Sequence, residues 1–242
     1  MELLTALILG SAPAIGWLYF YLKEDIHPEP WKKLLRTFIS GIAAAPIVLI
    51  LENIFSKPLF SFDPSWTLFY AFLIAALIEE GFKFLAALPM KHDKEFDEPI
   101  DAMIYMITAS LGFATAENIV LVLREIHNPL SPINWFAFAN ISLSSTIQLL
   151  SIRFMGATLL HTLASGLLGY YWAQSMQTHK TRYLIFGFFT AIGLHTAFNY
   201  LIIYYGNVSF LYTTSLLIVA GFFLLNDFEL LKGNLTNSQE RV

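Results

Sequence analysis

Two adjacent glutamates and one lysine interrupt an apolar stretch of the chain, in the order Glu79-Glu80-Gly81-Phe82-Lys83. Lys83 follows Glu79 by four residues and Glu80 by three, so on a helix both carboxylates reach toward the ammonium group. A structural ion pair accounts for one carboxylate, and the second then keeps either a net charge or a proton. A buried carboxyl group that holds a proton near neutral pH suits general acid–base catalysis.

Three later apolar stretches each carry polar side chains of the kinds that active sites use. They are, in chain order, Phe113 with Glu117 and Asn118, then His161, then His195 with Asn199. Phe113 and Glu117 are one helical turn apart, as are His195 and Asn199, so each pair shares a helix face. For each residue alone, the structural alternative is a glutamate near the membrane surface or a histidine hydrogen-bonded between helices.

Three kinds of chemistry could use this set of residues. Two histidines, His161 and His195, and the carboxylate of Glu117 could hold a zinc ion, with a separate glutamate as base. Without a metal, a glutamate could activate water while His and Asn side chains stabilise the oxyanion. A transporter could use the same residues as a proton or cation relay. The chain has no His-Glu-x-x-His, Gly-x-Ser-x-Gly, P-loop or Rossmann motif, so a serine nucleophile and a nucleotide site are disfavoured.

The composition defines the elements that must position these residues. Apolar residues make up 56% of the 242 and charged residues only 13%, whereas about 25% of a soluble domain is charged. The net charge of −4 argues against a nucleic-acid binder, and the absence of cysteine excludes disulfides, thiolate metal sites and a thiol nucleophile. We therefore expect an all-α, polytopic transmembrane helical bundle. It would be a single membrane-embedded domain over 1–242, with a catalytic core at about 64–205 and a short polar tail at 226–242.

Seven apolar stretches are long enough to cross a hydrocarbon core of about 30 Å as helices. They are residues 3–22, 34–55, 66–90, 100–123, 154–174, 183–204 and 208–225. The segment 133–150 is moderately apolar but rich in Asn, Ser and Thr. It is either an eighth span or a helix that lies in the membrane interface.

The distribution of Lys and Arg favours seven spans over eight. With seven, one side of the membrane holds three basic residues: Lys57, Arg124 and Arg153. The other side holds ten: Lys23, Lys32, Lys33, Arg36, Lys91, Lys94, Lys180, Arg182, Lys232 and Arg241. An eighth span would change the counts to 6 and 7. We therefore predict an N-terminus outside, a cytoplasmic C-terminus, and a segment 133–150 on the outer side.

In this topology the polar groups of four spans lie at overlapping depth. Glu79, Glu117, His161 and His195 fall roughly 10–20 Å below the outer surface, at 1.5 Å per helical residue. A charge at the bilayer centre costs about 2.5–3.5 kcal/mol, so such groups persist where they face protein or water. One water-filled cavity that opens outward would account for all four residues.

The ordered motifs resemble the PrsW family of intramembrane proteases. They are Glu79-Glu80 with Lys83, Phe113 with Glu117-Asn118, the isolated His161, and His195 with Asn199. The related CAAX prenyl-protein proteases carry Glu-Glu-x-x-x-Arg and Phe-x-x-x-His instead. Here the cation is a lysine at the shorter spacing, and Glu117 stands where that branch has histidine, so CAAX processing is disfavoured.

The resemblance implies an endopeptidase of the bacterial plasma membrane that cuts a single-pass, anti-sigma-factor-like protein near its extracytoplasmic side. Of Glu79 and Glu80, one would activate water and the other would pair with Lys83. Glu117, His161 and His195 would hold the water, the oxyanion or a metal, and Asn199 would orient His195 or bind the substrate carbonyl. The cofactor would be none or a single divalent ion, with zinc as the candidate. The partners would be this substrate and the lipid bilayer, with no nucleic acid.

Two other functions stay open at this point. One is a proton- or cation-coupled transporter, although the sequence shows no inverted repeat or pair of broken helices of the kind transporters use. The other is a catalytically silent membrane scaffold or immunity protein, in which the carboxylates would serve only to pack helices together.

Overall fold

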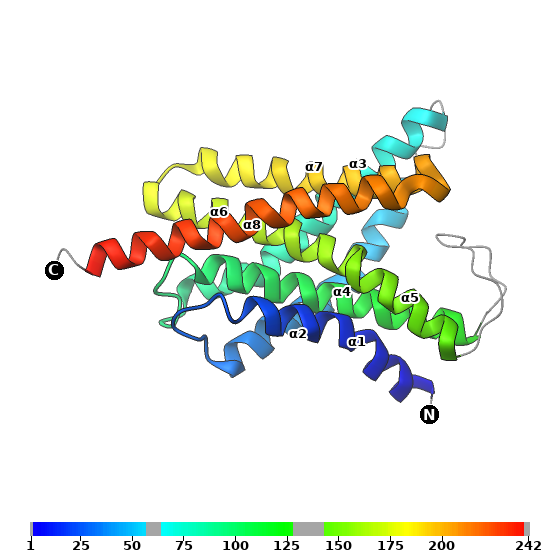
Figure 1. Ribbon diagram of the computed structural model, residues 1–242, viewed down its shortest axis with the longest axis horizontal. Coiled ribbons are helices and arrows are strands. Elements are labelled where there is room, and N and C mark those ends of the chain that lie inside the picture. The colour runs from blue at the N-terminus through cyan, green and yellow to red at the C-terminus, as the bar shows by residue number, and fades with distance from the viewer. Residues whose placement is uncertain (1, 57–63, 128–142, 240–242) are drawn as a thin grey trace.

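The computed structural model is a bundle of helices whose axes run mainly along its longest dimension (Figure 1). It describes residues 2–56, 64–127 and 143–239, and within these ranges there are helices and no strands. The α-helices are α1 (Glu2–Tyr21), α2 (Trp31–Ser56), α3 (Pro64–Ala87), α4 (Asp101–His127), α5 (Leu143–Met155), α6 (Ala157–Thr178), α7 (Thr181–Tyr205) and α8 (Ser209–Gln239). Two short 3-10 helices, η2 (Leu88–His92) and η3 (Gly206–Val208), join α3 to the loop before α4 and α7 to α8.

Five of the described helices are long and apolar enough to cross a membrane, namely α1, α2, α4, α7 and α8. This confirms the prediction of an all-helical, multi-pass membrane protein. The other two predicted spans, 66–90 and 154–174, correspond to α3 and most of α6, of 24 and 22 residues. Both helices carry part of the polar set, with Glu79, Glu80 and Lys83 on α3 and His161 on α6.

The ambiguous segment 133–150 falls partly on α5, while its residues 133–142 lie outside the described part of the chain. The described helix α5 has 13 residues, or about 20 Å at 1.5 Å per residue, against a hydrocarbon core of about 30 Å. The predicted span 154–174 begins too early, because the helix is interrupted at Gly156 (φ −109°, ψ −100°). The residues before Gly156 belong to α5, and α6 starts after it.

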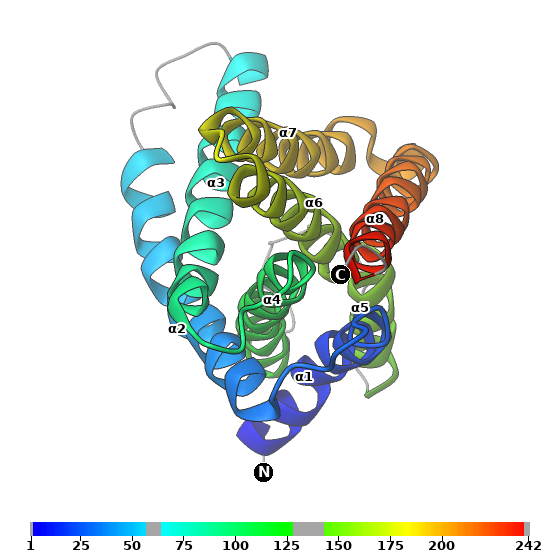
Figure 2. The same cartoon turned by 90° about the vertical axis from the view of Figure 1, so that its left-hand side faces the viewer.

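Helix α4 occupies the middle of the bundle, with α1, α2, α3, α5 and α6 around it (Figure 2). It crosses α2 at two glycines, and the close approach requires them. A Cβ atom at Gly41 would lie 2.0 Å from the carbonyl oxygen of Ala109, and one at Gly112 would lie 2.0 Å from that of Phe38. The two backbones therefore touch at this point, which fixes where the polar face of α4 lies relative to α2.

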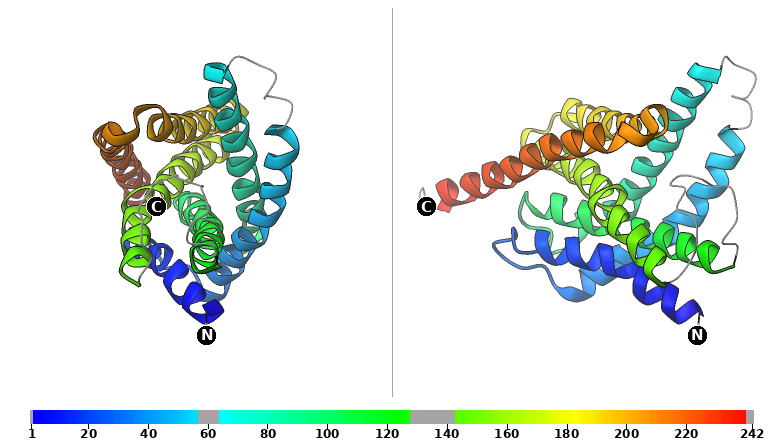
Figure 3. Two further views of the ribbon diagram at one scale, coloured as in Figure 1. Left: turned by 90° about the vertical axis from the view of Figure 1, so that its right-hand side faces the viewer. Right: turned by 45° about the vertical axis from the view of Figure 1, so that its right-hand side comes forward.

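Helix α8 continues beyond the predicted end of the last span. Residues 226–239 are helical rather than a separate tail, and this part extends past the neighbouring helices (Figure 3). Phe228 and Leu231, three residues apart on one face, are fully buried in the core. The ring of Phe228 stacks on Tyr21 of α1 with 5.9 Å between the centroids. These contacts explain why the helix persists where the sequence becomes polar.

Acidic side chains in two loops hold one end of the bundle together. In the α1–α2 loop, Asp25 accepts hydrogen bonds from the backbone N–H groups of His27 and Glu29. The hydroxyl of Tyr105 on α4 donates to Glu29 at 2.5 Å, and His27 pairs with Glu98 at 2.5 Å. The loop between α1 and α2 is therefore anchored to the start of α4.

Candidate active site

The three charged residues of α3 form a buried ion-pair cluster. The Nζ atom of Lys83 donates to Glu79 Oε2 at 3.0 Å and to Glu80 Oε1 at 2.8 Å. The side chain of Lys83 is completely buried, as is that of Glu80, and Glu79 is 8% exposed. The prediction that one lysine reaches both carboxylates is confirmed. The spacing of three and four residues places all three groups on one helix face.

Both oxygens of Glu80 are engaged by neighbouring helices. Its Oε1 atom, besides Lys83, accepts a hydrogen bond from His195 Nδ1 of α7 at 3.0 Å. Its Oε2 atom accepts one from the hydroxyl of Ser165 on α6 at 2.8 Å. Since the carboxylate can only accept, the proton of neutral His195 lies on Nδ1 and the Nε2 atom keeps a free lone pair. Glu80 thus fixes the orientation of His195.

His161 of α6 is held in a similar way by another carboxylate. Its Nε2 atom lies 2.9 Å from Glu117 Oε2, and its Nδ1 atom lies 2.8 Å from Lys83 Nζ. An ammonium group only donates, so Nδ1 accepts and the proton of the neutral ring lies on Nε2, directed at Glu117. Glu117 orients His161 as Glu80 orients His195.

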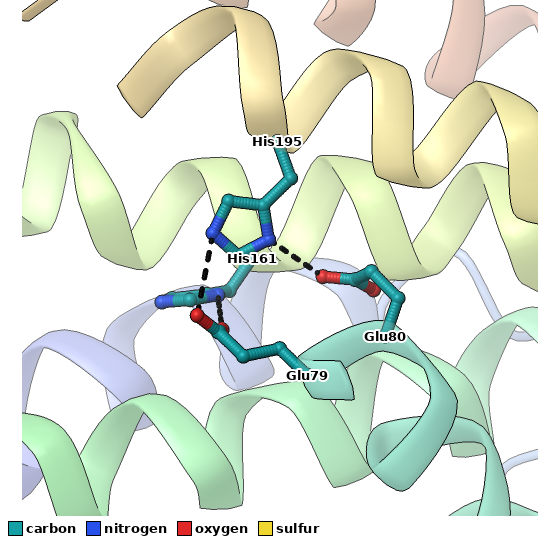
Figure 4. Close-up of side chains that lie close together, drawn as sticks. All are labelled: Glu79, Glu80, His161 and His195. Carbon is teal, nitrogen blue, oxygen red and sulfur yellow. Dashed lines mark hydrogen bonds and ion pairs between the residues drawn. The ribbon is translucent and has the colours of Figure 1, made fainter. Parts of the chain in front are cut away.

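The two oriented imidazoles face the carboxylate of Glu79 (Figure 4). His161 Nδ1 lies 3.7 Å from Glu79 Oε2, and His195 Nε2 lies 3.7 Å from Glu79 Oε1. The two rings are 5.1 Å apart and nearly perpendicular. The structure therefore brings together Glu79, Glu80, His161 and His195, which the sequence placed on three separate spans.

Phe113 and Asn118, predicted as supporting residues, pack around this group. The ring of Phe113 lies 4.7 Å from Lys83 Nζ, within cation–π range, and 5.9 Å from the ring of His161. Asn118 is buried and donates from Nδ2 to Thr158 Oγ1 at 3.3 Å, while its Oδ1 atom accepts from Arg153. Asn118 thus connects α4 to α5 and α6.

Asn199 lies one turn after His195 on α7 and is half-buried. Within the described part of the chain, no hydrogen bond joins its side chain to His195. Glu80 orients that ring instead. A role of Asn199 toward the substrate therefore stays a prediction.

Three residues that the sequence did not single out belong to the site. Ser165 lies one turn after His161 on the same face and contacts Glu80. Arg153 of α5 pairs with Glu117 at 3.1 Å. Glu52, near the end of α2, forms a hydrogen bond with Glu79 and lies close to Glu117. Glu52 could have been predicted from the sequence, because it is an acidic residue within an apolar helix. Arg153 could not, because its position resembles that of a basic residue in a loop.

The donor set fits a divalent cation. One ligand atom from each of Glu79, Glu80, His161 and His195 lies within 4.8 Å of the others, and all four residues are buried. Two ligands of one tetrahedral zinc ion lie about 3.4 Å apart, close to the 3.7 Å that separates Glu79 from His161 Nδ1 and from His195 Nε2. Glu117 is outside this group and contacts it through His161.

The net charge of the site also favours a bound cation. Four carboxylates, those of Glu52, Glu79, Glu80 and Glu117, lie near two cations, Lys83 and Arg153. Two formal negative charges therefore remain in a region from which bulk water is largely excluded. One divalent ion, or two protons, would neutralise them.

Comparison with known proteins decides the family. The sequence model of the "PrsW family intramembrane metalloprotease" matches residues 29–225. The chain belongs to the PrsW family. A protein called Protease PrsW from Geobacillus kaustophilus is 29% identical over 198 residues, which are 80% of this chain and 78% of that protein. One from Oceanobacillus iheyensis is 29% identical over 205 residues, covering 83% and 84% of the two chains.

A shorter match is found with Protease PrsW of Bacillus subtilis, 33% identical over 116 residues, or 47% of this chain and 52% of that protein. No solved structure matches the chain. The resemblance drawn from the motifs is thus confirmed: the chain is an intramembrane protease, a hydrolase that works in a lipid bilayer. The matched range 29–225 contains all of the residues that contact one another in the site.

Proposed function

We propose that the chain is an endopeptidase that cleaves a single-pass, anti-sigma-factor-like membrane protein near its extracytoplasmic side, using water activated by Glu79. The observation that supports this most is the position of Glu79 between two imidazoles, each held by another carboxylate. Glu80 has both oxygens occupied by Lys83, His195 and Ser165. Glu79 forms hydrogen bonds with Lys83 and Glu52, and its Oε1 atom lies 3.7 Å from His195 Nε2.

In this mechanism Glu79 takes a proton from water as the water oxygen attacks the carbonyl carbon of the scissile peptide bond. The same proton is then passed to the amide nitrogen, and the carbon–nitrogen bond breaks. His161 and His195 hold the attacking water or the oxyanion, and Glu117 keeps His161 in the required tautomer. Lys83 balances the charge of Glu80. In this proposal Asn199 binds the substrate carbonyl.

The family description names a metalloprotease, and the residues of this chain fit such a group. His161 and His195 would hold a divalent ion, with zinc as the candidate, and Glu79 beside them would still take the proton. An ion bound there would polarise the substrate carbonyl and acidify its bound water. Lys83 Nζ now contacts His161 Nδ1, the atom that would bind the ion, so the lysine would have to turn away toward Glu80.

The arrangement of the chain supports the proposed topology of seven spans with the N-terminus outside. The two termini lie at opposite ends of the bundle (Figure 1), as an odd number of crossings requires. Lys232 contacts Glu24, and Lys33 contacts Asp93, so basic residues predicted to be cytoplasmic gather at one end. By the positive-inside rule this end faces the cytoplasm of a bacterial plasma membrane.

The first test separates a protease from a scaffold or a transporter. We expect Glu79→Ala and Glu80→Ala to abolish cleavage of a co-expressed single-pass reporter, while the variant proteins accumulate to normal levels. Unchanged cleavage in both variants would refute the proposal. A transporter would instead show ion-dependent solute uptake in proteoliposomes, and a scaffold would keep its function with Glu→Gln changes.

The second test concerns the metal. Elemental analysis of purified, active protein, with His161→Ala and His195→Ala as controls, measures the bound ion directly. About one divalent ion per wild-type chain, lost in both variants, would support the metal-dependent form of the mechanism. Active protein without stoichiometric metal would leave Glu79 as the sole activator of water.

A further inference from the structure

A cavity of 180 Å³ lies between α2 and α4, directly beside the site. Apart from Pro46 of α2, its walls are two helical stripes with the same spacing. One consists of Ala45, Val48, Leu49 and Glu52 on α2, and the other of Phe113, Ala116, Glu117 and Val120 on α4. Each stripe follows the i, i+3, i+4, i+7 pattern of one helix face. The cavity is therefore apolar along most of its length, with one glutamate contributed by each wall.

Three residues connect this cavity to the catalytic groups. Glu52 forms a hydrogen bond with Glu79, and Glu117 forms one with His161 at 2.9 Å. Phe113 contacts Lys83 from the same wall. A side chain that entered the cavity would thus contact Glu52 and Glu117, which lie beside Glu79 and His161. The apolar space and the proposed catalytic carboxylate belong to one continuous site.

We propose that this cavity is a substrate subsite that takes one large apolar side chain next to the scissile peptide bond. The inference rests on the proposed proteolytic function and specifies its substrate. An apolar cavity of about 150 Å³ accommodates benzene, so 180 Å³ admits a side chain the size of Leu, Met or Phe.

A second cavity, of 520 Å³, is less suited to this role. It is lined by Trp66 and Phe69 of α3 and by Ala197, Tyr200 and Leu201 of α7. Phe69 precedes Glu79 by ten residues, or about 15 Å along the helix. Ala197 lies about 200° around α7 from His195, on the opposite face. This second cavity therefore provides a matched control.

The experiment uses the full-length protein in lipid vesicles and a set of model single-pass proteins. Each model protein carries one of the twenty residues at one position of the extracytoplasmic flank, and mass spectrometry of the fragments locates the cut. We expect wild-type protein to prefer Leu, Met or Phe over Ala at one position near the cut by at least about tenfold in kcat/KM. No such preference in a protein that cleaves would overturn the proposal.

Two variants alter the cavity in opposite directions. Ala116→Leu fills it, so the preference for Leu or Phe over Ala should fall at least about tenfold. Val48→Ala enlarges the cavity. The cleavage rate of the model protein that carries Trp at the varied position should therefore rise relative to that of the model protein that carries Ala. Ala197→Leu, in the second cavity, should leave the profile as in wild type.

An unchanged profile in both Ala116→Leu and Val48→Ala would overturn the subsite, as would a shift caused by Ala197→Leu instead. A cavity that holds only a lipid chain would give that unchanged profile. If wild-type protein and Glu79→Gln both fail to cleave every model protein, the proposed proteolytic function itself is wrong. If only the proposal about the cavity is wrong, wild-type protein still cleaves the model proteins.

Discussion

The Glu80 carboxylate accepts a hydrogen bond from His195 Nδ1 at 3.0 Å, and this contact turns the Nε2 atom of the ring toward Glu79. Glu117 does the same for His161 from the other side. Glu80 and Glu117 therefore each orient an imidazole, and Glu79 faces the other nitrogen atom of each ring. A histidine whose second nitrogen is held by a carboxylate is typical of metal ligands and of catalytic bases.

Glu80→Gln should lower cleavage by about 10- to 100-fold, the usual effect of losing a group that orients a ligand or a base. The glutamine has no charge to balance Lys83 and can turn its amide toward His195. Ser165→Ala removes only the hydrogen bond to Glu80 Oε2 and should cost less than tenfold. Initial rates on a single-pass reporter measure both effects. A larger loss in Ser165→Ala than in Glu80→Gln would contradict the assigned role of Glu80.

Lys83→Met should destabilise the protein when no divalent ion is present and should tighten the binding of such an ion. It leaves two buried carboxylates without their cation, a loss of the kind that costs about 3–5 kcal/mol, and it clears His161 Nδ1. Thermal unfolding in detergent, with and without zinc, and calorimetric titration of zinc measure the two effects.

Lys232→Met is the matched control for Lys83→Met. Lys232 also pairs with two carboxylates, those of Glu24 and Glu229, but it lies outside the site and is 21% exposed. Its loss should cost at most about 1 kcal/mol and should leave zinc binding unchanged. Equal zinc affinities in Lys83→Met and wild-type protein would show that the lysine and the ion do not share a position.

Gly112→Ala should lower the melting temperature strongly, because the new Cβ would lie 2.0 Å from the carbonyl oxygen of Phe38. This neighbour is backbone, so α2 and α4 would have to separate, and we expect a cost of about 1–3 kcal/mol or more. Gly193→Ala is the control, because a Cβ there meets no atom within 4 Å. Equal melting temperatures in the two variants would contradict the tight crossing of α2 and α4.

The order of the motifs predicted which spans meet, because charged and imidazole groups in apolar helices need one another. The i+3 and i+4 spacing on α3 was sufficient to predict the contacts of Lys83. The roles of Ser165, Arg153 and Glu52 depend on partners that are distant in sequence, since Ser165 is 85 residues from Glu80. The break at Gly156 and the length of α8 depend on packing between helices. The spacing of apolar residues along the sequence does not predict such packing.

Protonation of the α1–α2 loop should make stability depend on pH. Burial raises the pKa of Asp25 above its ordinary value, and it raises that of Glu29 as well. The folded state therefore holds these protons more tightly than the unfolded state. The contribution to stability is complete below pH about 4 and is lost as pH rises through the raised values.

The double variant Asp25→Asn, Glu29→Gln has no such protons to lose. Its melting temperature in detergent should therefore fall less than that of wild-type protein between about pH 4 and pH 8. Glutamine at position 29 can still accept the hydrogen bond from Tyr105, which limits the structural change. Parallel curves for the two proteins would exclude a contribution from these carboxyl groups.

The most direct test of the mechanism is the cleavage rate of a purified single-pass reporter in proteoliposomes that contain wild-type protein, Glu79→Gln or Glu229→Gln. Glu229 is 70% exposed and lies outside the site. Its variant should cleave at the wild-type rate. If Glu79 takes the proton from water, Glu79→Gln should be slower by at least about a hundredfold, with an unchanged melting temperature. Cleavage by Glu79→Gln within a few-fold of the wild-type rate would contradict the mechanism.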